Sequence, residues 1–213
     1  MSALAIRATG ARVERHAAAP TLVFELEIDE SSGQPIESIA LQCQIRIEPH
    51  RRPYTREEEG RLLELFGEAP RWGDTLKPFL WTHAATMVQG FTGSTKVELP
   101  VACTYDVEVA SAKYLHALGD GEIPALLLFS GGVFARQPGG LFITQIPWDV
   151  ESTLRVPVRI WREMMDQYFP NAGWLRLHKD TLDALLRCKA RRALGSWDET
   201  MRVLLKSAGE EVE

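Results

Sequence analysis

The clearest structural signal in the sequence is residues 39–47, which read IALQCQIRI. The odd-numbered positions carry apolar side chains, and the even-numbered ones from Gln42 to Arg46 carry polar side chains. Successive side chains of a β-strand point to opposite faces of its sheet, so this period of two predicts a strand with one buried face. Cys43 belongs to the apolar set, and we therefore expect its thiol to be packed in the core.

Comparable patterns predict strands on both sides of this segment. We expect them at residues 21–28, 82–91, 95–109, 123–134, 141–146 and 153–156. Pro100 interrupts one of these runs, and because proline cannot donate to a sheet ladder it marks an edge position, a bulge or a crossing between sheets. Residues 123–134 are apolar on both faces, which favours a central strand.

Helical patterns follow the second strand and dominate the last third of the chain. Thr55 and Glu58 have the spacing of a capping box, so we expect a short helix over residues 55–66 that ends at Gly67. Residues 70–81 are rich in aromatic residues and interrupted by proline, which predicts a loop with a helical turn. Near the C-terminus three helices are expected, at residues 158–168, 180–194 and 196–205.

These elements predict an α+β fold. Short strands separated by turns, with no strand–helix–strand alternation, favour an antiparallel β-sandwich or strongly curved sheet of about eight strands, followed by three C-terminal helices packed on it. The alternative is a single open sheet backed by the helices. We expect one domain over residues 1–213, with a flexible N-terminus at 1–20, a β-rich part at 21–156 and a helical part at 157–207.

The composition excludes several classes of protein. Hydrophobic residues make up 45% of the 213 residues and charged residues 25%, as in ordinary globular proteins. The formal charge is -5, so neither nucleic acid nor a membrane surface is an expected partner. The three cysteines are widely spaced, and residues 1–19 lack the apolar core of a secretory signal. We therefore expect a cytoplasmic protein with reduced thiols.

No catalytic or nucleotide-binding motif is present in the sequence. The five histidines include none paired at the spacing of metal ligands, although His83, Cys103 and His116 could meet in space as a weak candidate metal site. No cofactor is expected.

Three groups of residues form candidate binding surfaces. His50, Arg51 and Arg52 follow a predicted strand and could bind an anion or an acidic partner, or form a solvated loop. Arg191 and Arg192 lie at a predicted helix end, where they could dock a partner or complement the helix dipole. Among the tryptophans, Trp72, Trp81 and Trp148 lie near prolines and glycines, which allows either core packing or a recognition surface.

Several short phrases of the chain, taken together, carry a family resemblance. They are IEPHRRPY at 47–54, RWG at 71–73, LWTH at 80–83, FTGST at 91–95, PVACTYD at 100–106, LFSG at 128–131 and IPW at 146–148. With these phrases the chain resembles, over about residues 21–205, a bacterial domain family of unknown function, DUF6084. The resemblance brings no established activity and no catalytic residues. It implies an association with genes of an oxygen-tolerant uptake nickel–iron hydrogenase.

The leading functional hypothesis is therefore a non-enzymatic accessory protein that binds another protein through a sheet edge or through loops bearing tryptophan and arginine. The resemblance implies that a hydrogenase subunit or maturation factor is the partner. A metal-handling protein for nickel or iron is the second hypothesis. An unrecognised enzyme is the third, and it requires a pocket that contains several titratable groups.

Overall fold

The computed structural model describes residues 4–103, 109–137, 139–170 and 177–210. Within these residues the chain forms eight strands, six α-helices and two short 3-10 helices, at Pro49–Arg51 and Ala69–Arg71. The chain divides into two compact units, Met1–Asn171 and Ala172–Glu213. None of the described helices has both the length and the apolar character needed to cross a lipid bilayer.

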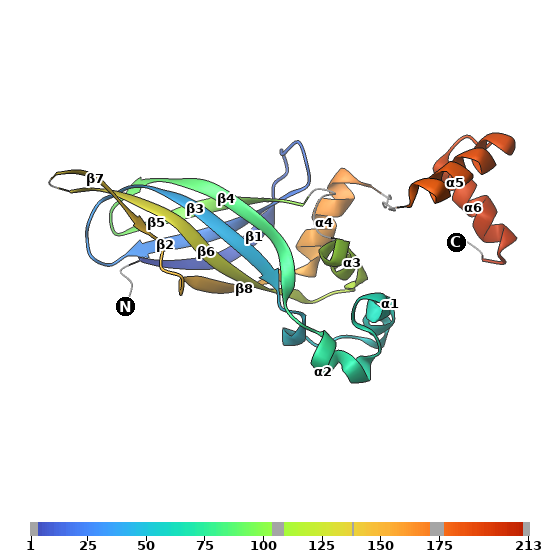
Figure 1. Cartoon of the computed structure of the whole chain (residues 1–213), viewed down its shortest axis with the longest axis horizontal. Coiled ribbons are helices and arrows are strands. Elements are labelled where there is room, and N and C mark those ends of the chain that lie inside the picture. The colour runs from blue at the N-terminus through green and yellow to red at the C-terminus, as the bar shows by residue number, and fades with distance from the viewer. Residues whose placement is uncertain (1–3, 104–108, 138, 171–176, 211–213) are drawn as a thin grey trace. The chain divides into compact units, whose positions relative to one another are not determined.

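The first unit is built on two antiparallel sheets (Figure 1). Its strands are β1 (Leu4–Val13), β2 (Thr21–Glu30), β3 (Ile36–Ile47), β4 (Phe79–Phe91), β5 (Ser94–Ala102), β6 (Glu122–Gln137), β7 (Gly140–Gln145) and β8 (Glu151–Pro157). One sheet has the order β1-β2-β5, and the other has the order β4-β3-β6-β7, with β8 also pairing with β6. The predicted α+β fold with antiparallel sheets is confirmed.

The core lies between the two sheets. It is formed by the alternate apolar side chains that the period of two predicts, with Leu41, Cys43 and Ile45 of β3 all buried. Phe24 of β2 meets Trp81 of β4 edge-on, with ring centroids 5.9 Å apart. The predicted burial of Cys43 is confirmed, and desolvation raises the pKa of its thiol to about 12.

A glycine inside β6 permits the close pairing of β6 with β3. Gly131 has φ +128, and a Cβ atom at this position would lie 1.9 Å from the carbonyl oxygen of Ala40 on β3. Only glycine fits here without displacing a strand. Pro100 lies on β5, an outer strand of its sheet, which agrees with the predicted edge position.

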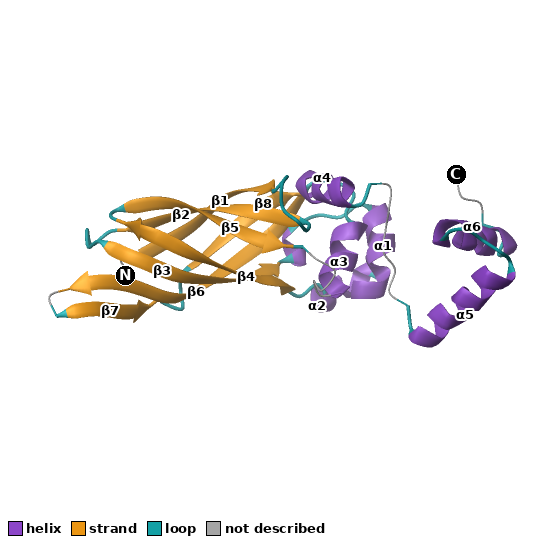
Figure 2. Cartoon of the chain, turned by 90° about the horizontal axis from the view of Figure 1, so that it is seen from above, coloured by secondary structure: helices purple, strands orange, loops and turns teal. Residues whose placement is uncertain are grey.

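Four helices of the first unit gather beyond one end of the strands (Figure 2). They are α1 (Arg56–Phe66), α2 (Trp72–Thr75), α3 (Val109–Ala117) and α4 (Val158–Tyr168). The predicted capping box is present: Thr55 accepts from the Glu58 N–H, and the Glu58 side chain accepts from the Thr55 N–H. The Gly67 N–H closes the helix by donating to Leu63 O.

Two elements differ from the expectation. Residues 4–13 form β1, where a flexible N-terminus is expected. Its apolar alternation is weak, and backbone pairing with β2 over the whole length supplies the stability that the local pattern lacks. Residues 109–117 form α3, where the strand at 95–109 is expected to end; residues 104–108 lie outside the described residues.

The second unit consists of α5 (Lys179–Arg191) and α6 (Trp197–Ser207). Both helices lie where the sequence predicts them, and Ser196 caps α6 by accepting from the Glu199 N–H. The three helices expected near the C-terminus are therefore present as α4, α5 and α6, and α4 belongs to the same compact unit as the sheets.

Candidate functional site

Strand β7, one of the outer strands of the larger sheet, has a side with which no described strand pairs. Among the described residues it pairs only with β6. The Ile146 N–H donates to Gly131 O at 2.9 Å, and antiparallel pairs alternate between hydrogen-bonded and non-hydrogen-bonded types. The non-hydrogen-bonded residues of β7, whose N–H and C=O groups point away from β6, are therefore Leu141, Ile143 and Gln145. We call this row of backbone groups the β7 edge.

Both faces of β7 are exposed and apolar. Leu141 and Ile143 are each 58% exposed and share the outward face of the sheet. Ile143 lies opposite Phe134 on β6, and both side chains lean over Gly132, where an added Cβ would lie 3.4 Å from Ile143 Cγ2 and 3.7 Å from a Phe134 ring carbon. Phe142 points to the opposite face and is 45% exposed.

A groove runs along this opposite face. It encloses about 310 Å³, and Phe142 and Thr144 of β7 line it together with Val133 of β6. Its far wall comes from the end of β2 and the turn that follows. Hydrogen bonds from Ser32 and from the next backbone N–H groups lower the pKa of Glu30, which keeps an anionic carboxylate on the groove wall.

Trp148 extends into solvent beside the β7 edge. It lies in the tight turn between β7 and β8, which is closed by the Val150 N–H donating to Pro147 O at 3.1 Å. The Trp148 side chain is 93% exposed, the most exposed large apolar group of the described chain. The Trp148 side chain is therefore accessible to a partner, as a recognition role requires.

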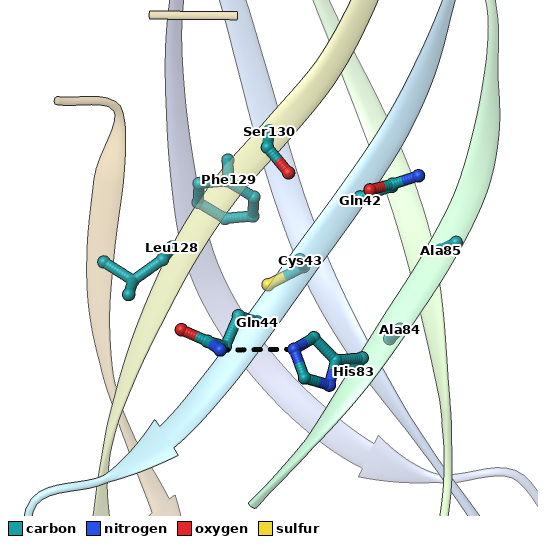
Figure 3. A pocket seen from close by; sticks show the side chains of 9 residues that line it. All are labelled: Gln42, Cys43, Gln44, His83, Ala84, Ala85, Leu128, Phe129 and Ser130. Carbon is teal, nitrogen blue, oxygen red and sulfur yellow. Dashed lines mark hydrogen bonds between the residues drawn. The ribbon is translucent and has the colours of Figure 1, made fainter. Parts of the chain in front are cut away.

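A second hollow of about 480 Å³ lies on the outward face of the same sheet (Figure 3). Gln44 of β3 contacts His83 of β4, with their Nε2 atoms 3.2 Å apart. Ser130 lies on β6, with β3 between it and β4, so it is separated from His83 by two strand spacings, about 10 Å. Ser130 also lies opposite Gln42, two residues along β3 from the partner of His83, and its hydroxyl forms no hydrogen bond with the imidazole, the arrangement that activates a serine nucleophile.

The predicted basic surface at residues 50–52 is only partly a surface. His50 and Arg51 are exposed, but the Arg52 side chain is 7% exposed and forms an ion pair with Glu58 at 2.8 Å. Its guanidinium also donates to Asp120 O and lies 4.9 Å from the centre of the Tyr54 ring. Arg52 therefore joins α1 to the loop before β6 and does not belong to an exposed basic surface.

Two of the three candidate tryptophans are structural. Trp81 is 1% exposed and belongs to the core, which is the first of the two alternatives open for it from the sequence. Trp72 is half-buried, packs edge-on against Tyr54 and Phe66, and donates from Nε1 to Gly67 O at 2.9 Å. Trp81 packs between the sheets, and Trp72 anchors the helical end of the unit.

The weak candidate metal site is not assembled. His83 lies on the outward sheet face, Cys103 is buried at the end of β5, and His116 packs edge-on against Trp161. No group of three or more His, Cys, Asp or Glu side chains within the described residues is arranged to hold a metal ion. The other candidate residues, Arg191 and Arg192, are exposed at the end of α5.

Residues of β7 were missed as candidates by the sequence reasoning. The segment at 140–145 reads GLFITQ, which lacks both the polar face of a half-buried strand and any charged residue. That lack is the signal that marks an unprotected strand, but a fully buried central strand gives the same signal. Only the order of the strands in the sheet distinguishes an exposed edge strand from a buried central strand.

Comparisons with known proteins give a family but no activity. No curated protein matches the sequence significantly. Among solved structures the chain is similar to a β-glucosidase from Kluyveromyces marxianus, with 5% identity and a TM-score of 0.27; the match covers 72% of this chain and 15% of that one. A family of unknown function, DUF6084, matches residues 1–213. The chain therefore belongs to the DUF6084 family.

Proposed function

We propose that this protein is a non-enzymatic binding protein that holds an extended segment of a partner protein on the β7 edge. The observation that carries the proposal is the outer side of β7, with which no described strand pairs. The strand carries no charged side chain, and its exposed side chains are mainly apolar. Exposed sheet edges of soluble proteins are normally protected by charged side chains, proline, bulges or very short strands. The segment GLFITQ has six residues and none of the protecting side chains.

The surroundings of the edge define the segment that fits. A strand added to a sheet places alternate side chains on its two faces. On the outward face they would meet Ile143 and Phe134, and on the other face they would enter the groove lined by Phe142. Trp148 adds an aromatic contact at one end. The fitting segment is therefore extended and uncharged at its centre, with apolar side chains on both faces.

The association with hydrogenase genes that the family resemblance implies supports a class of partner. We propose a hydrogenase subunit or maturation factor as the natural partner, and the cytoplasm as the compartment. The free cysteines Cys43, Cys103 and Cys188 support a reducing compartment.

Panning a display library of random decapeptides on the purified chain tests the proposed edge. We expect the enriched peptides to be apolar at consecutive central positions. Ile143→Pro removes one outward N–H donor of the β7 edge and leaves the pairing of β7 with β6 intact. Its matched control, Ile143→Ala, removes the same side chain but keeps the donor.

The two variants separate backbone pairing from simple apolar contact. We expect Ile143→Ala to weaken binding of an enriched peptide about threefold to tenfold, and Ile143→Pro to weaken it about tenfold further. Equal binding by the two variants would show that the edge donor takes no part, and the proposal would be wrong. Pull-down of a co-produced hydrogenase subunit by the wild type but not by Ile143→Pro tests the partner class separately.

A further inference from the structure

The described residues of the second unit, 177–210, bury too little apolar surface to be stable by themselves. Every buried apolar side chain of the described chain lies between Leu4 and Met165, and Thr200 is the one buried residue of α5 and α6. Units of about 40 residues normally need a disulfide, a metal or association with another surface. The described part of this unit has no metal cluster, and its cysteine, Cys188, is a free thiol.

The exposed apolar residues of the unit follow helical spacing. Leu182 and Leu186 of α5 are 39% and 46% exposed and lie four residues apart, so they share one stripe of the helix. Trp197 and Leu205 of α6 are each 40% exposed. This exposed apolar surface is available for a further contact.

The charges beside the leucine stripe are complementary to those of a second copy of the same helix. Asp183 and Arg187 each follow one of the two exposed leucines, so they lie along one flank of the stripe. Leu185 is the midpoint of the 13-residue helix α5, and Asp183 and Arg187 are equally far from it on opposite sides. A two-fold axis that is perpendicular to the helices and passes at the level of Leu185 would place Asp183 of each helix opposite Arg187 of the other. The antiparallel pair would then contain two such ion pairs.

We propose that α5 pairs antiparallel with α5 of a second copy of this chain, so that the protein is a homodimer held by its C-terminal unit. The contact is isologous, because the same patch serves both copies, and a closed two-fold dimer is the commonest symmetric assembly. Leu182 and Leu186 of both copies fill the centre, and the two Asp183–Arg187 pairs fix the antiparallel direction. The inference is independent of the partner proposed for the β7 edge.

Sedimentation velocity of the full chain tests the assembly with variants of reversed charge. We expect wild-type chain to sediment at twice the monomer mass. Asp183→Arg and Arg187→Asp each place like charges opposite each other at both pairs, and each variant alone should dimerise on the order of tenfold more weakly. An equimolar mixture of the two variants recreates both ion pairs and should dimerise as the wild type does.

The mixture distinguishes loss of the ion pairs from misfolding of α5 as the cause of weaker dimerisation. Mixing two misfolded chains would not restore dimerisation. Ile143→Pro serves as the control outside the second unit, and it should leave dimerisation unchanged. A monomeric wild-type chain at 100 micromolar would overturn the proposal, and so would dimerisation that neither charge variant changes. A mixture no stronger than the single variants would overturn the antiparallel pairing.

Discussion

Arg52 and Glu58 form a buried ion pair that fixes the helical end of the first unit. The Arg52 and Glu58 side chains are 7% and 3% exposed, and the Glu58 carboxylate also accepts from the backbone N–H groups of Thr55 and Gly119. One carboxylate thus caps α1, holds the loop before β6 and neutralises the guanidinium. Removing either partner leaves a buried charge with no counter-ion.

Replacing this arginine should destabilise the fold strongly. We expect Arg52→Ala to lower the free energy of unfolding by about 3 kcal/mol at pH 7, because the Glu58 charge stays buried. Arg61→Ala is the matched control, since Arg61 pairs with Glu57 on the exposed side of α1 and should change the free energy by about 0.5 kcal/mol or less. Urea unfolding measures both, and equal losses would contradict a special role for Arg52.

The same carboxylate predicts a pH dependence. Burial raises the pKa of Glu58, but hydrogen bonds from the Thr55 and Gly119 N–H groups and the charge of Arg52 outweigh it, so the pKa lies below its usual value. A lowered pKa stabilises the folded state above the ordinary glutamate pKa of about 4.3, and this stability is lost as the pH falls through the lower folded value. The stability difference between wild type and Glu58→Gln should therefore shrink between pH 5 and pH 2. A constant difference over that range would exclude the linkage.

Two glycines should respond oppositely to the same substitution. Gly131→Ala places a Cβ 1.9 Å from Ala40 O at φ +128, and we expect a loss of more than about 3 kcal/mol or no folded protein. Gly60 lies within α1 with open space around it, so Gly60→Ala should stabilise the chain by about 0.5–1 kcal/mol. Thermal unfolding of both variants, compared with wild type, measures the two changes.

At the scale of elements, local sequence signals specify helix α1 almost completely. The capping box of Thr55 and Glu58 and the closing Gly67 are visible in the sequence and present in the structure. Strand β7 is the opposite case. Its residues satisfy no pattern that distinguishes an exposed edge from a buried centre, and its exposure follows from its place after β6 in the sheet.

Removing the N-terminal cap of α1 should lower the free energy of unfolding, and a substitution that keeps the capping hydroxyl should not. We expect Thr55→Ala to cost about 1 kcal/mol, because the N–H of Glu58 loses its acceptor. Thr55→Ser keeps a hydroxyl acceptor and should stay within a few tenths of a kcal/mol of the wild type. Chemical denaturation distinguishes the two, and a large loss in Thr55→Ser would indicate that packing of the threonine methyl matters more than the cap.

At the scale of the whole molecule, the buried apolar side chains of the described chain all belong to the first unit, between Leu4 and Met165. The proposed partner segment and the proposed second copy therefore use different units. This separation allows one contact to be changed without disturbing the other.

Truncation tests this separation directly. A chain that ends at Asn171 should keep a cooperative unfolding transition whose midpoint lies within about 5 °C of that of the full chain at low protein concentration, because no core residue is removed. It should also sediment as a monomer, because the proposed dimer contact lies in the second unit. Loss of the cooperative transition would show that the second unit is part of the fold of the first.

The sequence by itself determined the elements whose signals are local. The alternation at residues 39–47 and the capping box at Thr55 specify a strand and a helix because period and hydrogen-bonding groups lie within a few residues of each other. The burial of Cys43 follows from its register in the same way.

Only the tertiary structure decided which strands are edges and which polar side chains are buried. β1 depends on its partner β2, Arg52 is buried by the loop at Asp120, and β7 is exposed because no described strand pairs with its outer side. These properties come from contacts between residues far apart in the chain. Pairing and burial across such distances depend on the arrangement of the sheets, which no short segment of the sequence encodes.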